Sequence, residues 1–185
     1  MGYNGLKKSW IFPGQASQFV GMGKDLFDST DVGKKYYNLA NDILEVDIQD
    51  ISFNGPEEKL KITKYTQPAI FIVSSVISHL LIENGHVPGC VAGHSLGEYS
   101  ALTAAGGISF ETGLELVKIR CNSMDKAGIT NPGTMAAIIG LNMDSVVKLA
   151  KSIKTNEVVV AANHNTENQI VISGNINAVT EFVSI

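Results

Sequence analysis

Gly93, Ser95 and Gly97 form a G-x-S-x-G pattern, which is typical of a serine nucleophile on a tight turn between a strand and a helix. Such a turn projects the serine hydroxyl into a cleft, and the two glycines let neighbouring backbone approach without a Cβ clash. The backbone N–H of the next residue, Leu96, then points at the oxyanion that develops when a carbonyl carbon is attacked. The pattern therefore predicts a nucleophilic Ser95, with Leu96 as one donor of an oxyanion hole.

The sequence on either side of this pattern supports that interpretation. Residues 90–92 are a short apolar run that predicts a buried strand, and the residues after Gly97 are compatible with a helix as far as about Ala105. The simpler alternative is a glycine-rich turn that carries a solvated serine, because so short a pattern also arises by chance.

The chain has 14 lysine and arginine residues, and Arg120 is the only arginine among them. Lysine supplies the positive charge at every other position, so the single arginine suggests a position that requires the guanidinium group itself. The guanidinium group is a planar fork with two donors that matches a carboxylate in a bidentate way. This suggests a carboxylate-binding Arg120, although an ordinary arginine on a helix surface is the usual interpretation when the residue is taken without further context.

The elements that must position these side chains are predicted over residues 1–129. Strands are predicted at 10–12 and 90–92, and helices at 36–44, 68–84 and 97–105. Pro68 is expected at the first position of its helix, behind Thr66 and Gln67. A further helix is expected to be capped by Ser109, with one apolar face made by Leu114, Val117, Cys121 and Met124.

The breaker residues Asn131, Pro132 and Gly133 predict a subdomain boundary, with a second part over residues 130–185. There the pattern predicts a strand at 135–139, a helix at 144–153, strands at 158–162 and 169–172, and a helix from 178. This β-α-β-β-α order resembles a ferredoxin-like unit without its last strand. The predicted fold class is α/β, with a parallel-sheet, α/β-hydrolase-like core and a small ferredoxin-like subdomain.

The C-terminal residues suggest that both parts of this fold are cut short. Val179, Phe182, Val183 and Ile185 make an apolar helical face that stops without a glycine cap or a basic last turn. Natural ends are usually polar and frayed. We therefore expect the face of Val179, Phe182 and Val183 to be exposed.

Composition predicts a globular chain in a reducing compartment. Apolar residues make up 44% of the chain and charged residues 17%, with a net charge of −4 and no long basic run, which argues against nucleic-acid binding. Cys90 and Cys121 form neither a metal spacing nor a disulfide framework. The polar start has no apolar signal region, and the apolar stretch 69–82 is too short and too polar to span a bilayer. We expect a cytoplasmic protein.

Four blocks, in order along nearly the whole chain, carry a resemblance to a known family. Residues 93–102 spell Gly-His-Ser-Leu-Gly-Glu-Tyr-Ser-Ala-Leu, and residues 12–18 spell Phe-Pro-Gly-Gln-Ala-Ser-Gln. The other two blocks are Thr-Gln-Pro-Ala at 66–69 and Met-Ala-Ala-Ile at 135–138. These blocks resemble the malonyl-CoA:acyl carrier protein transacylases and the acyltransferase domains of fatty acid and polyketide synthases.

The resemblance implies a reaction and a set of site residues. A malonyl group would move from coenzyme A to the phosphopantetheine thiol of acyl carrier protein through a covalent intermediate on Ser95. Arg120 would bind the free carboxylate of the malonyl group, and the backbone N–H of Gln15 would join Leu96 in the oxyanion hole. Asn163 and Asn165 would lie near the site. Malonyl-CoA and acyl carrier protein are the expected partners of a monomer, with no metal or redox cofactor and no membrane or nucleic-acid partner.

The chain departs from the family at Ala16, where glycine is usual. If this position needs a positive φ, alanine costs about 1 kcal/mol or more there, and we expect it to loosen the oxyanion loop.

A serine hydroxyl needs a general base, and none of the four histidines is a good candidate. His79 lies in the apolar helix, His86 follows the helix-stopping Gly85, and the side chain of His94 should point away from that of Ser95. His164 stands between two asparagines at a predicted strand end, where the family does not place its base. The family's catalytic histidine lies in a later block that this sequence does not contain.

Two other functions stay open. An α/β-hydrolase-type esterase would need His164 as the base, with Asp125 or Asp144 as the acid, and would leave Arg120 and Gln15 unexplained. A non-enzymatic acyl-binding or carrier-docking fragment would explain the absent base, but the nucleophile, the oxyanion loop and the arginine are all intact. The first reading, an acyltransferase, accounts for most of these residues.

Overall fold

In the computed structural model, which describes residues 8–153 and 157–185, the chain divides into two units that comprise 1–125 and 126–185. The predicted boundary between 129 and 130 lies in the last turn of the helix that leads into the second unit. The predicted polar start of the chain lies outside the described residues as far as position 7. The first unit and the connecting helix contain β1 (Ser9–Phe12), α1 (Lys24–Ser29), α2 (Asp31–Leu44), α3 (Ile48–Asn54), α4 (Glu57–Leu60), α5 (Thr63–Glu83), β2 (Cys90–Gly93), α6 (Gly97–Ala104) and α7 (Phe110–Thr130).

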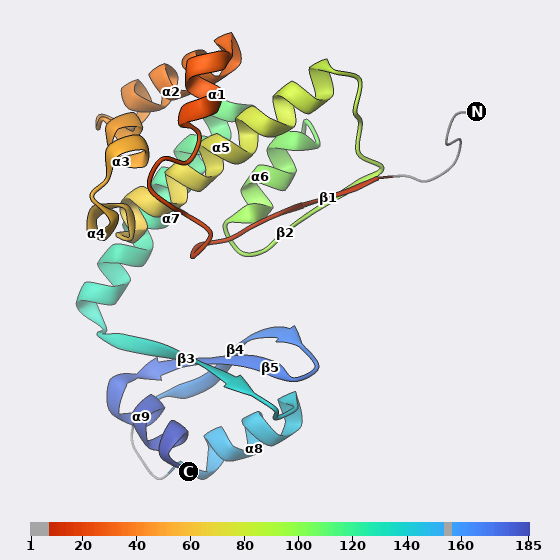
Figure 1. Ribbon diagram of the computed structural model, residues 1–185. Helices are drawn as coiled ribbons and strands as arrows, with labels where there is room; N and C mark the ends of the chain where they lie inside the picture. Colours follow the sequence, from red (N-terminus) through yellow and green to blue (C-terminus); the bar gives the residue numbers. More distant parts are fainter. Residues whose placement is uncertain (1–7, 154–156) are drawn as a thin grey trace. The chain divides into compact units, whose positions relative to one another are not determined.

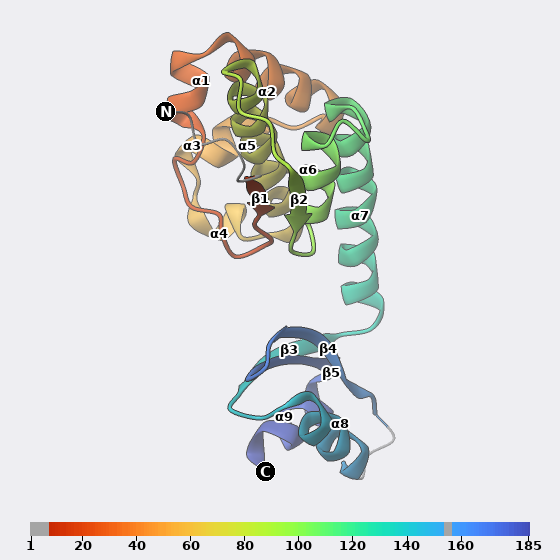
Figure 2. The ribbon, with the colours of Figure 1, turned by 90° about the vertical axis from the view of Figure 1, so that its right-hand side faces the viewer.

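The fold is mixed α/β, and the sheet of the first unit is a parallel pair of strands. β1 and β2 are aligned from Ser9 opposite Cys90 to Phe12 opposite Gly93. Side chains alternate across this pair because successive residues of a strand point to opposite faces. One face packs Phe12 against Ala101 and Ala104 of α6, and Figure 2 shows α6 beside the two strands. On the other face Ile11 is 79% exposed.

The central helix of the first unit is α5, which lies beside α2, α3 and α6 (Figure 1). It begins at Thr63, so the prediction that Pro68 is the first helical residue is wrong. Pro68 has no N–H to bond to the carbonyl of Lys64 one turn earlier. That carbonyl instead meets the thiol of Cys121 at 3.8 Å, and the same thiol lies 3.3 Å from the carbonyl of Lys118 in its own helix. A weak polar partner from α7 thus lies where the proline removes a helical hydrogen bond.

The extra turn also makes α5 longer than the predicted apolar stretch 69–82. Within the described part of the chain, α5 is the one helix whose length and composition would let it cross a membrane. This is weak evidence for a span, because buried core helices meet the same two criteria. In this fold Ile70, Phe71, Ile72 and Val76 of α5 are buried in the core.

The main core of the first unit lies between the helices. Tyr37 of α2, Phe71 of α5 and Leu114 of α7 are each fully buried there. The helix α2 starts earlier than predicted because the Thr30 hydroxyl accepts a hydrogen bond from the Gly33 N–H. Ser109 bonds to the Thr112 N–H in the same way at the start of α7, as predicted.

The second unit is a three-stranded antiparallel sheet with the strand order β3-β5-β4. Its elements are β3 (Gly133–Ile139), α8 (Met143–Ser152), β4 (Val159–Thr166), β5 (Gln169–Asn175) and α9 (Ile176–Ser184). Its core joins Ile170 and Ile172 of β5 to both helices. The predicted exposed face is confirmed at Val183, which is 55% exposed, and wrong at Val179 and Phe182, which are 3% and 2% exposed in this core. The sheet itself covers them.

Candidate active site

Ser95 lies at the turn between β2 and α6, two residues after the last strand residue and two before the first helical residue. It has a φ of 55°, which is left-handed backbone that costs an L-residue about 1–2 kcal/mol. Strain of this kind is held by the surrounding structure and occurs often at functional sites. Ser95 is exposed, and Leu96 behind it is fully buried in the core. The turn therefore holds the Leu96 side chain in the core and leaves the Ser95 side chain exposed.

The glycines of the pattern are needed for close packing. A Cβ on Gly93 would overlap backbone atoms of Gly97 and Glu98, and a Cβ on Gly97 would overlap the carbonyl of Phe12. Gly14 is similar, since a Cβ there would lie 2.7 Å from the carbonyl oxygen of His94. These contacts bring the end of β1, its following loop and the start of α6 together at Ser95.

Arg120, on α7, reaches Ser95. Its Nη2 donates a hydrogen bond of 2.8 Å to Ser95 Oγ. The guanidinium carbon lies 6.0 Å from the centre of the Tyr99 ring, close enough for a cation–π interaction. Arg120 is half-buried, and its other donors stay available to a ligand next to the serine. The chain's one arginine and its predicted nucleophile, 25 residues apart, thus form one site.

Two backbone N–H groups beside the serine have no acceptor. Among the described residues, neither the Gln15 N–H nor the Leu96 N–H donates a hydrogen bond. Unpaired backbone donors near a nucleophile are the arrangement that an oxyanion needs.

The loop that carries Gln15 is strained and internally bonded. Ala16 has a φ of 85°, so this position does require the left-handed backbone. The Ala16 N–H donates to the side chain of Gln18 at 2.9 Å, and the Ser17 hydroxyl donates to the carbonyl of Gly14 at 2.8 Å. These bonds leave the neighbouring Gln15 N–H as a donor without an internal partner.

Sequence reasoning missed Gln67, a fully buried residue of α5. Its Nε2 donates to Gln15 Oε1 and to Met124 Sδ, both at 3.3 Å, and its Oε1 has no partner among the described residues. Such an unpaired buried acceptor costs about 1–3 kcal/mol. Thr63, one turn earlier, accepts a bond from Gln15 Nε2 at 3.2 Å. The sequence did contain a signal for Gln67, because it is a glutamine within an otherwise apolar face of a helix.

Met124 was predicted on the apolar face of α7 with Leu114, Val117 and Cys121. Those three are buried, but Met124 is 45% exposed.

Burial raises the pKa of the Cys121 thiol, so the thiol stays protonated near neutral pH and is a poor nucleophile.

Among the described residues, the hydrogen bond to Ser95 Oγ comes from Arg120. His79 instead pairs with Tyr36 through Nδ1 at 2.9 Å and with Glu83 through Nε2 at 3.2 Å. His86 is exposed in the loop before β2, and His164 is exposed within β4 rather than at its end.

Asn163 and Asn165 also lie on β4, which belongs to the second unit. Asn165 Nδ2 donates to Gln169 Oε1 at 3.1 Å. Their place near Ser95 stays a prediction. In residues 8–153 and 157–185, no group of three or more His, Cys, Asp or Glu side chains is arranged to hold a metal ion.

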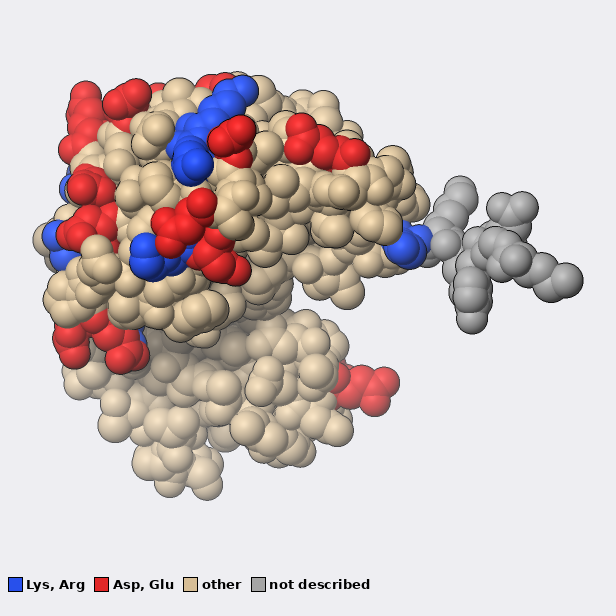
Figure 3. All heavy atoms as spheres, turned by 45° about the horizontal axis from the view of Figure 1, so that its top comes forward, with Lys and Arg blue, Asp and Glu red and all other residues tan. Residues whose placement is uncertain are grey.

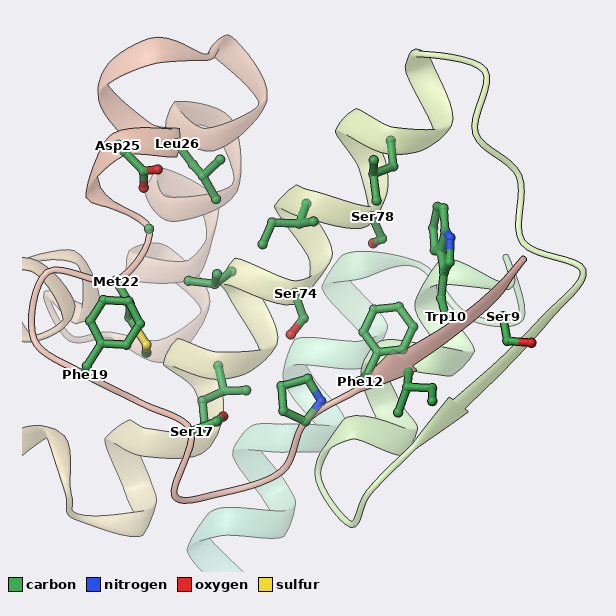
Figure 4. A pocket seen from close by; sticks show the side chains of 17 residues that line it. Ser9, Trp10, Phe12, Ser17, Phe19, Met22, Asp25, Leu26, Ser74 and Ser78 are labelled. Atoms are coloured by element: carbon green, nitrogen blue, oxygen red, sulfur yellow. The ribbon is translucent and has the colours of Figure 1, made fainter. Parts of the chain in front are cut away.

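A separate apolar pocket of about 610 Å³ lies between β1, the loop after it, α1 and α5. Figure 4 shows the ring of Phe12 and the hydroxyl of Ser74 directed into it. Ser95, Gln15 and Arg120 do not line this pocket, so it is distinct from the candidate site.

Charged side chains of both signs are mixed on the face that Figure 3 shows. Lys24 pairs with Asp28, and Lys61 pairs with Glu57, at 3.0 and 2.8 Å. That face therefore offers no broad surface of one sign.

Comparisons with known proteins agree with this geometry. The family model described as "Acyl transferase domain" matches residues 9–185. The chain is 42% identical to a malonyl CoA-acyl carrier protein transacylase of Synechocystis, over 94% of this chain and 57% of that protein. It is 38% identical to the transacylase of the same name from Bacillus subtilis, over 86% of this chain and 50% of that protein.

Solved structures give the same result. The malonyl CoA-acyl carrier protein transacylase from Coxiella burnetii superposes with a TM-score of 0.90 at 35% identity, covering 96% of this chain and 57% of that one. A malonyl-transacylase in complex with a type II PKS acyl-carrier protein matches with a TM-score of 0.89 at 37% identity, over 97% of this chain and 58% of that one. The chain spans between 50% and 58% of the length of these relatives.

Proposed function

The chain belongs to the acyl transferase domain family, and from that premise we propose that it is the nucleophile-bearing part of a malonyl-CoA:acyl carrier protein transacylase. The observation that carries this proposal is the 2.8 Å hydrogen bond from Arg120 Nη2 to Ser95 Oγ. It puts a carboxylate-binding group directly beside Ser95, where a substrate with a free carboxylate near its thioester could meet both.

The reaction would run in two steps through Ser95. In the first, Ser95 Oγ forms a bond to the thioester carbonyl carbon of malonyl-CoA, the C–S bond breaks, and coenzyme A leaves as the thiol with the serine proton. In the second, the phosphopantetheine thiol of acyl carrier protein attacks the seryl ester and returns the proton to Ser95. The overall reaction exchanges one thioester for another through an oxygen ester on Ser95, and neither step uses a redox or metal cofactor.

The negative oxygen in each tetrahedral intermediate would be held by two backbone donors. The Gln15 and Leu96 N–H groups are unpaired among the described residues and flank the serine turn. A preorganised donor of this kind contributes on the order of 10²–10³ in rate. Arg120 would leave Ser95 Oγ for the malonyl carboxylate when substrate binds, since a carboxylate is a stronger acceptor than a hydroxyl.

The general base would come from the part of the relatives that this chain does not match. The family resemblance implies a histidine in a later block, and the chain spans 57% of the Synechocystis relative. Without it the hydroxyl of Ser95 stays largely protonated near neutral pH, and loss of the base from a serine triad costs several orders of magnitude.

The finer fold assignment belongs to the same proposal. The strand–turn–helix around Ser95 and the parallel pair β1-β2 support an α/β-hydrolase-like core. The order β3-β5-β4, with β3 at one edge of the sheet, supports a ferredoxin-like second unit that takes a further strand beside β3. We also expect a cytoplasmic monomer that acts on malonyl-CoA and acyl carrier protein in fatty acid or polyketide synthesis.

Acyl-enzyme formation tests the proposal. The 185-residue chain and a chain extended through the reading frame to its natural stop are each mixed with malonyl-CoA, and intact-mass spectrometry follows the malonyl adduct. The expected result is an adduct that Ser95→Ala abolishes and that forms much faster on the longer chain.

Three outcomes would count against parts of the proposal. An adduct that persists in Ser95→Ala would overturn the nucleophile, and equal rates for the two chains would mean that a base within these 185 residues serves Ser95. Turnover of simple esters without malonyl loading would favour the esterase.

A further inference from the structure

Gln67 contacts both halves of the candidate site from a position with no access to solvent. It is fully buried on α5, and its single Nε2 donates to Gln15 Oε1 and to Met124 Sδ, each at 3.3 Å. Met124 lies one turn after Arg120 on α7. Gln67 is therefore a bridge between the loop that carries an oxyanion donor and the helix that carries the arginine.

The Gln67 amide nitrogen faces two acceptors in this structure. They are the Gln15 carbonyl oxygen and the Met124 sulfur. The consequence is that Oε1 is buried without a partner among the described residues. Stability alone does not favour this arrangement, because an apolar side chain of the same shape would avoid the unpaired oxygen.

The side chain of Gln15 is held at both ends by the same helix. Its oxygen accepts from Gln67, and its nitrogen donates to the Thr63 hydroxyl one turn earlier, at 3.2 Å. Residues four apart on a helix share a face, so Thr63 and Gln67 clamp the amide as a pair. The next residue in the loop, Ala16, has a φ of 85°, and a clamp on Gln15 keeps this unfavourable backbone in place.

We propose that Gln67 is a positioning residue that sets the direction of the Gln15 N–H through the hydrogen bond to the Gln15 side chain. It touches no reacting atom. The inference rests on the proposed role of Gln15 as an oxyanion donor and deepens it by identifying what orients that donor.

Gln67→Met is the main test, because methionine keeps the length and removes the donor. Acylation of Ser95 is followed by mass spectrometry with two reagents: malonyl-CoA, and p-nitrophenyl acetate, which has neither coenzyme A nor a carboxylate. The chain used is the form that acylates faster in the preceding experiment. The expected result is a loss of about tenfold or more in the acylation rate constant with both reagents, because a misaligned donor loses part of the oxyanion stabilisation, while half-saturation by malonyl-CoA changes less than about threefold.

Stability separates this role from a structural one. Gln67→Met removes an unpaired buried oxygen, so its unfolding midpoint in urea should be equal to or higher than that of the wild type. Ser75→Ala is the matched control, since Ser75 Oγ on the same helix is also buried without a partner among the described residues. It should leave acylation unchanged. If Gln67→Met does not fold, Thr63→Val tests the other end of the clamp and should slow acylation about threefold.

The two reagents distinguish failure of this inference from failure of the proposed function. Wild-type labelling by the ester but not by malonyl-CoA would sink the malonyl proposal and leave the role of Gln67 standing. Wild-type rates for both Gln67→Met and Thr63→Val with the ester would overturn the role of Gln67, as would a Ser95 that reacts with neither reagent. Non-additive effects of Gln67→Met and Gln15→Met in a double-mutant cycle would show that Gln67 acts through Gln15.

Discussion

The backbone of Ala16 has a conformation that favours glycine over a residue with a side chain. Its φ of 85° lies in the region that costs an L-residue about 1–2 kcal/mol, and no other non-glycine residue of the described loop 13–18 has a positive φ. The loop keeps this conformation because the Ala16 N–H bonds to Gln18 and the Ser17 hydroxyl bonds to Gly14.

Replacement of Ala16 by glycine should therefore raise the free energy of unfolding by about 0.5–1 kcal/mol, after the greater freedom of glycine in the unfolded chain is subtracted. Urea denaturation measures the change. Ala127→Gly, in the helical backbone of α7, should have the opposite sign, with a loss of about 1 kcal/mol. A loss of stability in both variants would contradict the strain at position 16.

Arg120 differs from the 13 lysines in what its head group can do. A lysine at this position would keep the charge but lose one of two charge-assisted hydrogen bonds, on the order of 1.5–3 kcal/mol. We expect Arg120→Lys in the complete enzyme to slow malonyl transfer by about tenfold to a hundredfold and to change acetyl transfer little, since acetyl has no carboxylate.

Initial rates with malonyl-CoA and acetyl-CoA measure this preference, and Lys126→Arg on the same helix is the control for the exchange itself. An unchanged preference for malonyl in Arg120→Lys would mean that this residue is not the carboxylate clamp.

At the scale of elements, the junction of β1, β2 and α6 depends on glycine. The carbonyl of Phe12 at the end of β1 occupies the space that a Cβ on Gly97 would need. Gly97→Ala must push β1 away from α6 and should destabilise the first unit by about 1–3 kcal/mol. Gly128→Ala is the control for the exchange itself, because Gly128 lies on α7 within the second unit and the added Cβ meets nothing within 4 Å beyond its own helix. It should leave the unfolding of the first unit unchanged.

Trp10 provides the signal for this measurement. It is the one tryptophan of the chain and packs beside Phe12 against α6, so its fluorescence reports the junction directly. If Gly97→Ala unfolds at the same midpoint urea concentration as the wild type, then Gly97 does not pack closely against the Phe12 carbonyl.

The elements most easily predicted were those whose signal is local. The short strands, the Ser109 cap and the amphipathic helix behind Arg120 follow from periodicity and capping. The start of α5 at Thr63 could not be found this way, because proline normally marks a first turn and the thiol that meets the Lys64 carbonyl comes from Cys121, 57 positions after Lys64.

The site divides in the same manner. Ser95 and Arg120 were found from a turn pattern and from a rare residue type. Gln67 was not, because its role depends on hydrogen bonds to Gln15 and Met124, which are 52 and 57 positions away. The short helices α1, α3 and α4 were also missed, since each has seven residues or fewer and presents too little periodicity to detect.

At the scale of the whole molecule, each unit has its own hydrophobic core, and the core of the first contains an ionisable group. Burial raises the pKa of Tyr37 from 10.0 to about 12. In the unfolded chain the phenol loses its proton near pH 10, whereas in the folded unit it keeps it. The folded state therefore holds more protons between these values, and its stability falls as the pH rises.

The contribution of Tyr37 is fully present below pH 10 and should decrease by about 1.4 kcal/mol between pH 9 and pH 11. Urea denaturation at the two pH values, followed by Trp10 fluorescence, measures the loss. Tyr37→Phe has no phenol to ionise and should show a shallower dependence by that amount. Parallel pH profiles for the two chains would mean that the Tyr37 phenol titrates alike in both states.

The buried thiol of Cys121, next to the Lys64 carbonyl, makes it possible to measure by alkylation how often α5 and α7 separate. Cys121 is buried between α5 and α7, with its sulfur 3.8 Å from the Lys64 carbonyl oxygen, whereas Cys90 is exposed. An alkylating reagent should therefore modify Cys90 at the rate of a free thiol and Cys121 only when the two helices separate. The ratio of the two rates reads the frequency of that opening in the native chain, without denaturant and without an added probe.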